Sequence, residues 1–340
     1  KLKEMIENDG VCGVTSNPAI FDKAISQSSL YDDAIRQFLA QNQDADINDL
    51  YESIVIEDIQ GAADVLMKVY RETDGADGFV SLEVSPHLAY NTEETIKEAV
   101  RLWDKVNRPN LMIKVPATEQ GIPAIETLLS RGINVNVTLM FSLSHYEAVS
   151  HAYIRGMTVN EEPAKTASVA SFFVSRLDTK VDAMLDKIGS EDALSLKGCI
   201  AIDNSRLTYH RFKQIFRSKG FNKLKSRGCR VQRPLWASTS AKNPEYSDVM
   251  YVENLIGTDT VNTLPPKTLE AFRDHGKADP RVEENLQKAE FDMDKLAKLN
   301  IDLNEITEQL QKEGVDKFIA SFDSLMNTLE QKRKEIRSES

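Results

Sequence analysis

A lysine inside an otherwise apolar strand is the residue of this sequence best suited to covalent chemistry. Lys114 lies in the run Leu-Met-Ile-Lys-Val-Pro-Ala-Thr (111–118), and strand alternation places its side chain on the face opposite Ile113. An ammonium among aliphatic side chains is costly unless it is paired or loses its proton. A neutral lysine is a nucleophilic amine, suited to forming a Schiff base with a carbonyl carbon. The alternative is a strand-end lysine whose ammonium snorkels to water.

Polar side chains occupy one face of other predicted strands. These side chains are Ser81 and Glu83 in 80–84, Asn134, Asn136 and Thr138 in 133–139, and Ser171 in 169–174. Phe173 shares a strand face with Ser171. Such a face could meet water in an antiparallel sheet. In a parallel barrel, helices cover the outside, and polar residues near the carboxyl ends of the strands face inward and carry the chemistry. The side chains then expected in one pocket are Lys114, Glu83, Asn17, Asn136, Thr138 and Ser171.

Strands alternate with helices along most of the chain. Strands are predicted at 11–15, 78–84, 111–117, 133–140, 168–174, 230–238 and 260–265. Helices are predicted at 1–9, 19–40, 50–72, 92–106, 122–131, 142–155, 178–188 and 203–217, with a polar loop at 156–167 and mostly helix from 267 onward. This alternation indicates parallel βαβ units. Because no GxGxxG or Walker A motif follows a strand, a closed barrel is favoured over a nucleotide-binding sheet.

The composition narrows the class of protein. With 340 residues, 41% hydrophobic and 28% charged, the chain fits a globular protein large enough for one barrel domain. A net charge of −11 argues against nucleic acid or an anionic membrane as the partner, and no apolar run is long enough to span a membrane. Three distant cysteines favour a reducing cytoplasm over a disulfide framework. The five histidines lack metal-ligand spacing, so neither a metal nor another cofactor is expected.

Five motifs, in their order and spacing, resemble the transaldolase family. They are 13–18 (Gly-Val-Thr-Ser-Asn-Pro), 81–84 (Ser-Leu-Glu-Val), 113–118 (Ile-Lys-Val-Pro-Ala-Thr), 134–138 (Asn-Val-Asn-Val-Thr) and 168–176 (Ser-Val-Ala-Ser-Phe-Phe-Val-Ser-Arg). The stretches 233–239 and 261–265 are similar to the longer bacterial type of that family. The resemblance covers essentially the whole chain. It implies a single (β/α)8 TIM-barrel domain over 1–340, with additional C-terminal helices in 267–340.

The same resemblance implies a metal-independent transferase of the pentose phosphate pathway. Such an enzyme moves a dihydroxyacetone unit from sedoheptulose 7-phosphate to glyceraldehyde 3-phosphate, giving erythrose 4-phosphate and fructose 6-phosphate. Lys114 would attack the ketose C2 carbonyl and form the Schiff base, which lets the C3–C4 bond break. Glu83 would act as acid and base with a water that Thr138 holds.

The resemblance also assigns the binding of the phosphorylated ketose and aldose substrates. Asn17, Asn136 and Ser171 would bind the dihydroxyacetone hydroxyls, and Phe173 would line the pocket. Arg176 would take the substrate phosphate, because a guanidinium fork suits its geometry. The two further matches to the phosphate site are Ser238 and, in place of a family arginine that this sequence lacks, Lys242.

Each of these residues also has a purely structural interpretation. Glu83 could pair with Lys114 for structure alone, Asn17 could cap a helix, and Arg176 could pair with Asp178 at a helix start. Jointly these interpretations do not explain why five strands each supply a polar residue to one end. Two other functions stay open: a plain aldolase that releases dihydroxyacetone to water, and a catalytically silent sugar-phosphate-binding barrel. Product analysis with and without an acceptor aldehyde would distinguish the plain aldolase from a transaldolase. The presence of both the lysine and the glutamate argues against the silent binding barrel.

The two ends of the chain complete the expectations. Apolar residues recur at helical spacing at Val315, Phe318, Ile319, Phe322, Leu325, Met326 and Leu329. Packing against the barrel is the default for this C-terminal helix, and the resemblance leaves open closure over the barrel mouth or a contact in a homodimer. Only seven of eight barrel strands are counted. We therefore expect a segment of roughly 15–30 residues before Lys1 that holds the first strand and the family's acid/base aspartate, or else a severely impaired protein.

Overall fold

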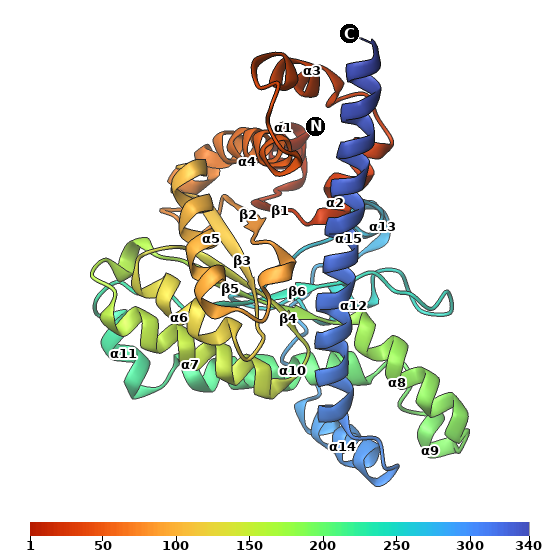
Figure 1. Cartoon of the computed structure of the whole chain (residues 1–340). Coiled ribbons are helices and arrows are strands. Elements are labelled where there is room, and N and C mark those ends of the chain that lie inside the picture. The colour runs from red at the N-terminus through yellow and green to blue at the C-terminus, as the bar shows by residue number, and fades with distance from the viewer. Residues whose placement is uncertain (340) are drawn as a thin grey trace. The chain divides into compact units, whose positions relative to one another are not determined.

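The computed structural model describes residues 1–339 (Figure 1), and the chain divides into two compact units. The first unit contains Lys1–Val115 and the chain from Gly314 onward, and the second unit contains Pro116–Glu313. Each unit is built from parallel strands joined by helices, as βαβ connections require. Among the described residues, no helix combines the length and the apolar character needed to cross a membrane.

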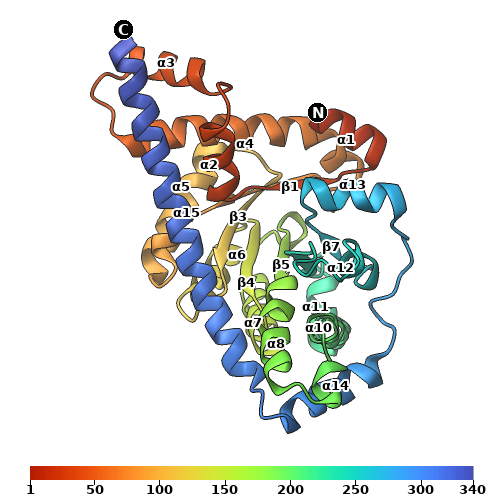
Figure 2. The ribbon, with the colours of Figure 1, turned by 90° about the vertical axis from the view of Figure 1, so that its right-hand side faces the viewer.

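The first unit holds three strands. Its elements are α1 (Leu2–Asp9), β1 (Gly13–Thr15), α2 (Pro18–Ser26), α3 (Asp32–Gln41), α4 (Ile47–Glu72), β2 (Phe79–Glu83), the short helix η1 (Pro86–Leu88), α5 (Thr92–Val106), β3 (Leu111–Pro116) and the later part of α15 (Leu303–Glu339). Strand β2 pairs in parallel with β1 and with β3, and its register sets Glu83 directly opposite Lys114. Figures 1 and 2 show α3 beside the end of α15, where Lys332 pairs with Asp32.

The second unit holds four strands. Its elements are α6 (Gly121–Ser130), β4 (Val135–Met140), α7 (Leu143–Val159), the short helix η2 (Pro163–Lys165), β5 (Ser168–Phe173), α8 (Ser175–Ile188), α9 (Glu191–Leu194), α10 (Ile200–Phe216), α11 (Lys219–Lys225), β6 (Arg233–Ala237), α12 (Met250–Asn254), β7 (Val261–Asn262), α13 (Pro266–His275), α14 (Leu286–Lys298) and the first part of α15. Successive strands from β4 to β7 pair in parallel. Helix α10, seen end-on in Figure 2, packs against α8 and α14.

Four of the strands are covered on both faces. Every residue of β2, β3, β4 and β5 is buried. Parallel strands have this property because their crossover helices cover the sheet. Polar side chains on these strands are therefore inside the protein, where each one needs a partner or a function.

The strand predictions are confirmed at all seven places, and one helix is confirmed to the residue. Helix α5 spans Thr92–Val106, and the Asn91 side chain caps it by accepting a hydrogen bond of 3.1 Å from the backbone N–H of Glu94. The predicted eighth strand would precede residue 1, outside the described residues, and stays a prediction. That the chain forms a single domain also stays a prediction.

Two helix predictions are wrong in their bounds. The single helix expected at 19–40 is two helices, because the Ser28 hydroxyl donates to the Ala24 carbonyl at 2.6 Å and closes the first one. The loop expected at 156–167 begins later, because α7 continues through Gly156 to Val159. A Cβ at Gly156 would lie 2.6 Å from the Glu126 carbonyl oxygen, so this glycine permits close helix packing instead of ending a helix.

Candidate active site

Lys114 and Glu83 form a buried pair in the first unit. Their side chains project from registered positions of β3 and β2, and Lys114 Nζ lies 3.4 Å from a Glu83 carboxylate oxygen. Lys114 is 6% exposed and Glu83 is 8% exposed. The ammonium also donates to the Ser16 carbonyl oxygen at 3.1 Å, and its nitrogen lies 5.6 Å from the centroid of the Phe318 ring. The lysine is thus held by two oxygen acceptors under an aromatic face.

Burial makes Glu83 a better proton carrier than a surface glutamate. Desolvation raises the pKa of Glu83, and the neighbouring charge of Lys114 lowers it without cancelling the effect of burial. A buried ion pair contributes little net stability, since desolvation offsets the attraction between the charges. A perturbed carboxyl beside a buried amine is instead the arrangement expected of catalytic groups that exchange protons.

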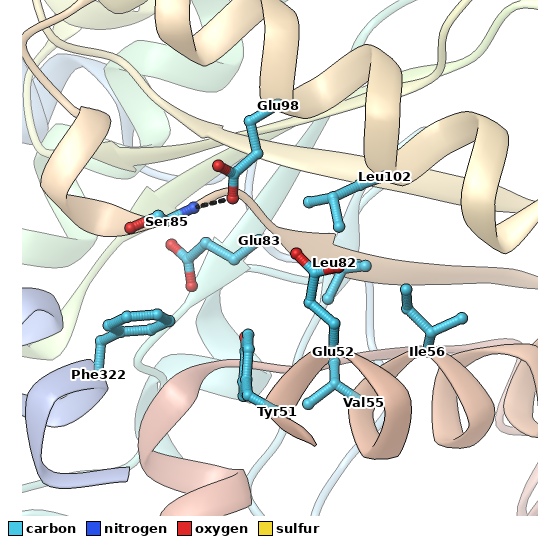
Figure 3. A pocket seen from close by; sticks show the side chains of 10 residues that line it. All are labelled: Tyr51, Glu52, Val55, Ile56, Leu82, Glu83, Ser85, Glu98, Leu102 and Phe322. Atoms are coloured by element: carbon cyan, nitrogen blue, oxygen red, sulfur yellow. Dashed lines mark hydrogen bonds between the residues drawn. The ribbon is translucent and has the colours of Figure 1, made fainter. Parts of the chain in front are cut away.

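Glu83 also lines a small cavity of the first unit (Figure 3). The cavity measures about 20 Å³, which is room for one water molecule. Figure 3 shows the Glu83 side chain near Phe322 and Tyr51, whose rings meet edge to face at 5.4 Å. On another side of the cavity, Glu98 accepts a hydrogen bond of 3.0 Å from the Ser85 backbone. A water at this place would contact the carboxylate that the pair with Lys114 positions.

Asn17 lies at the end of β1, before Pro18. Its side-chain oxygen caps α2 by accepting a hydrogen bond of 2.9 Å from the Ile20 backbone, and the residue is half-buried. The structural interpretation of Asn17 as a cap is therefore correct. Its amide N–H₂ group is a further donor that the cap does not use, so the cap does not exclude the binding role.

Asn136 and Ser171 lie on neighbouring strands of the second unit. The Ser171 hydroxyl donates to the Asn136 side-chain oxygen at 2.7 Å, and both residues are buried. This bond orients the asparagine so that its amide nitrogen is the donor end. The sequence predicted that both residues share a site, and the structure brings them together.

Thr138 lies where β4 departs from regular geometry. The register between β4 and β5 shifts after Val137, and Leu139 adopts a φ of 62°. Thr138 is 1% exposed, and its hydroxyl has no hydrogen-bond partner among the residues that the structure describes. A buried hydroxyl in this state is suited to bind a water molecule or a substrate group.

Arg176 lies in the first turn of α8, just after β5. Its guanidinium carbon is 5.4 Å from the centroid of the Phe173 ring, which fixes the head of the side chain. Burial lowers the pKa of Arg176 and the charge of Glu313 raises it. An arginine remains charged in such surroundings, so this half-buried cation is available to an anion.

Ser238 follows β6 in a left-handed conformation, with φ 57°. Its hydroxyl lies 2.9 Å from the Ser175 hydroxyl, beside Arg176 in the sequence. Lys242 is exposed and donates to the Ser240 hydroxyl at 2.6 Å. The structure thus links Ser238 to the start of α8, whereas Lys242 lies further along the segment after β6.

Three contacts of the site were not predicted from the sequence. The Ser16 carbonyl is a backbone acceptor, and backbone atoms leave no residue-specific signal. Ser175 lies in the recognised motif 168–176 but was given no role. Phe318 belonged to the helical apolar pattern of the C-terminal helix, which predicted packing and did not single out this ring. Among the described residues, no group of three His, Cys, Asp or Glu side chains could hold a metal ion.

Comparisons with known proteins agree with the geometry. A family model described as transaldolase/fructose-6-phosphate aldolase matches residues 1–329. A transaldolase of Trichodesmium erythraeum is 45% identical, covering 99% of this chain and 92% of the relative. Transaldolases of Thiobacillus denitrificans and Mycolicibacterium smegmatis are each 46% identical over 96% of this chain, and 91% and 89% of their own lengths.

Proposed function

This chain belongs to the transaldolase/fructose-6-phosphate aldolase family and acts as a transaldolase, and we propose that Lys114 is the residue that carries its substrate. The reaction moves a dihydroxyacetone unit from sedoheptulose 7-phosphate to glyceraldehyde 3-phosphate. Its products are erythrose 4-phosphate and fructose 6-phosphate. The seven parallel strands and their helices fit the TIM-barrel fold that the sequence predicted, and the eighth strand of a complete (β/α)8 barrel stays a prediction.

The single observation that carries the proposed site is the buried contact of 3.4 Å between Lys114 Nζ and Glu83. Glu83 takes the proton of the ammonium, and the neutral amine adds to the ketose C2 carbonyl. The carbinolamine then loses its oxygen as water, for which Glu83 returns the proton, and a protonated imine forms. The raised pKa of Glu83 suits both directions of this transfer, since the carboxyl must hold a proton and release it.

The imine makes the carbon–carbon cleavage feasible. As the C3–C4 bond breaks, its electron pair moves toward the imine nitrogen and gives an enamine. The C4 hydroxyl loses its proton and becomes the carbonyl of the departing aldose. Addition of glyceraldehyde 3-phosphate reverses these steps, and hydrolysis of the new imine frees the product. Thr138, whose buried hydroxyl needs a partner, holds the water that Glu83 uses.

The remaining residues bind the substrate. Asn17, Asn136 and Ser171 supply amide and hydroxyl groups for the hydroxyls of the three-carbon unit. Arg176, with its head fixed on Phe173, takes the phosphate as a charged fork. Ser238 and Lys242 add a hydroxyl and a second cation to the phosphate site.

The cellular setting and the assembly are proposals of the same kind. None of the three cysteines forms a disulfide bond among the described residues, which supports a reducing cytoplasm as the place of action. A homodimer is proposed from the family resemblance of the C-terminal helix. Light scattering from the purified protein gives its molar mass and tests the dimer directly.

A coupled assay with fructose 6-phosphate and erythrose 4-phosphate tests the function. We expect glyceraldehyde 3-phosphate to form only when the acceptor is present, together with sedoheptulose 7-phosphate. Steady release of free dihydroxyacetone without an acceptor would establish a plain aldolase instead. Binding of the sugar phosphates with no turnover in either assay would establish the silent binding barrel.

A further inference from the structure

Two carboxylates of α8 bind two tyrosines that follow β6 in the chain, one in the residues 238–249 and one in α12. Asp178 and Asp182 are four residues apart and therefore lie on one face of the helix. The hydroxyl of Tyr251 donates to Asp178 at 2.8 Å, and that of Tyr246 donates to Asp182 at 2.6 Å. Both carboxylates are buried. We name these two hydrogen-bonded pairs the carboxylate–tyrosine clamp.

The clamp is anchored on its other side by the first turn of α10 and the residues just before it. The second oxygen of Asp178 accepts from the backbone of Ala201 at 2.8 Å, and the second oxygen of Asp182 accepts from Gly198 at 3.1 Å. Gly198 has a φ of 69°, and a Cβ there would lie 2.9 Å from the Tyr246 ring. Each carboxylate thus joins α8, the start of α10 and the segment after β6, and the tyrosine ring packs closely on a glycine.

The segments that the clamp joins carry the groups proposed to bind phosphate. Arg176 lies two residues before Asp178 on α8, and the residues 238–249 between β6 and α12 carry Ser238 and Lys242. A shorter link supports the same arrangement, because the backbone N–H of Ser175 donates to the Ser238 carbonyl at 3.0 Å. The clamp lies at the far end of 238–249 from this link. Both ends of the segment are therefore fixed to α8.

The two carboxylates are costly to bury. Burial raises the pKa of Asp178 to about 7, although the hydrogen bonds from Ala201 and Tyr251 favour its ionised form. An apolar residue at this position would avoid that cost. Such costs are expected where an exact placement of neighbouring groups matters for function.

We propose that Asp178 and Asp182 are positioning residues that hold the segment 238–249 against α8, so that Arg176, Ser238 and Lys242 bind a substrate phosphate as one site. This inference rests on the proposed function. It adds a structural reason for the preference of the enzyme for phosphorylated sugars. The clamp does not touch the substrate. It limits the conformations of Arg176 and Lys242 before the phosphate binds, so that less conformational entropy is lost on binding.

The test removes one hydroxyl from the clamp. Tyr246→Phe keeps the ring and leaves Asp182 with only the backbone N–H of Gly198 as a donor among the described hydrogen bonds. We expect the dissociation constant of inorganic phosphate and the KM for fructose 6-phosphate to rise together by about 5- to 20-fold. The kcat should stay within about twofold, and the KM for unphosphorylated fructose should not change. Tyr153→Phe is the matched control, because it also removes a hydrogen-bonded tyrosine hydroxyl of the second unit, which donates to the Arg230 carbonyl at 2.5 Å.

The outcomes separate the inference from the function on which it rests. Equal effects of Tyr246→Phe on phosphorylated and unphosphorylated substrates would overturn the clamp, as would phosphate binding no weaker than in the Tyr153→Phe control. If Tyr246→Phe fails to fold, Tyr251→Phe gives the same readout from the other half of the clamp. Absence of aldol transfer in the unmodified protein would overturn the proposed function, whereas phosphate binding by the variants would still test the clamp.

Discussion

The two units of the protein differ in the kind of polar group that they bury on their strands. In the first unit, Lys114 and Glu83 are ionisable groups 3.4 Å apart. In the second unit, Ser171 and Asn136 form a neutral pair joined at 2.7 Å, close in sequence to the unpaired hydroxyl of Thr138. The first arrangement is suited to moving protons and forming a covalent bond, and the second to recognising hydroxyl groups. Substitutions in the first should therefore change kcat and its pH dependence, and substitutions in the second should change KM.

The strongest test of this difference is Lys114→Met, which keeps the volume of the side chain and removes the amine. We expect kcat to fall by at least about 10³-fold, because no other group can form the Schiff base. Borohydride with fructose 6-phosphate should fix a three-carbon adduct on Lys114 of the unmodified protein and none on the variant. Lys97→Met, at an exposed lysine paired with Glu94, should keep full activity. A labelled peptide that contains another lysine would contradict the assignment.

Glu83→Gln should have the next largest effect. The amide keeps the size of the side chain but cannot exchange the proton, so kcat should fall by roughly 10²-fold. Since burial raises the pKa of Glu83, the kcat of the unmodified enzyme should fall at low pH with an apparent pKa above the usual glutamate range. The variant should not show this fall in kcat. Full kcat in Glu83→Gln, with Glu94→Gln as the exposed control, would mean that the glutamate only pairs with the lysine.

Arg176→Ala tests the phosphate side of the second unit. Loss of a charge-assisted contact should raise the KM for fructose 6-phosphate by about 10- to 50-fold and leave unphosphorylated substrates less affected. Initial rates with both substrate types measure the ratio. Arg155→Ala, which removes an exposed arginine paired with Glu126, is the control. If both substrate types are affected alike, Arg176 has a structural role.

Ser171→Ala is the smallest of the four changes. It removes the donor that orients Asn136, so the KM of all ketose donors should rise by about 3- to 10-fold while the pH profile keeps its shape. Ser205→Ala is a matched control, because Ser205 is also fully buried and donates to the Ala201 carbonyl at 2.8 Å. A shift of the pH profile in Ser171→Ala would break the distinction between the two units.

Sequence patterns predicted the strands and the polar faces because both depend on local rules. The alternation at 133–139 was enough to place Asn136 and Thr138 inside, and an asparagine cap was enough to begin α5. The end of α7 was missed because the polar stretch 156–167 indicated a loop. Only the tertiary structure shows that Gly156 packs near Glu126, where the missing side chain permits a close crossing and the helix continues.

The clamp of the second unit could not be predicted for a different reason. Asp178 and Tyr251 are 73 positions apart, and Asp182 and Tyr246 are 64 apart. No local pattern pairs a helix carboxylate with a tyrosine at such separations, since only the tertiary fold brings them together. The roles carried by the family motifs were available from the sequence, whereas the contacts that support them came from the structure.

The registered pairing of Glu83 with Lys114 restricts where this chain can gain or lose residues. An insertion between the two strands, at the surface turn near Tyr90, only lengthens a connection and leaves both side chains opposite each other. A single residue added within either strand, by contrast, would turn one side chain to the other face and separate amine from carboxylate. Changes of length should therefore accumulate in the connections, and a scan of single-residue insertions over residues 79–116 would find tolerated positions in the turn near Tyr90 and none within β2 or β3.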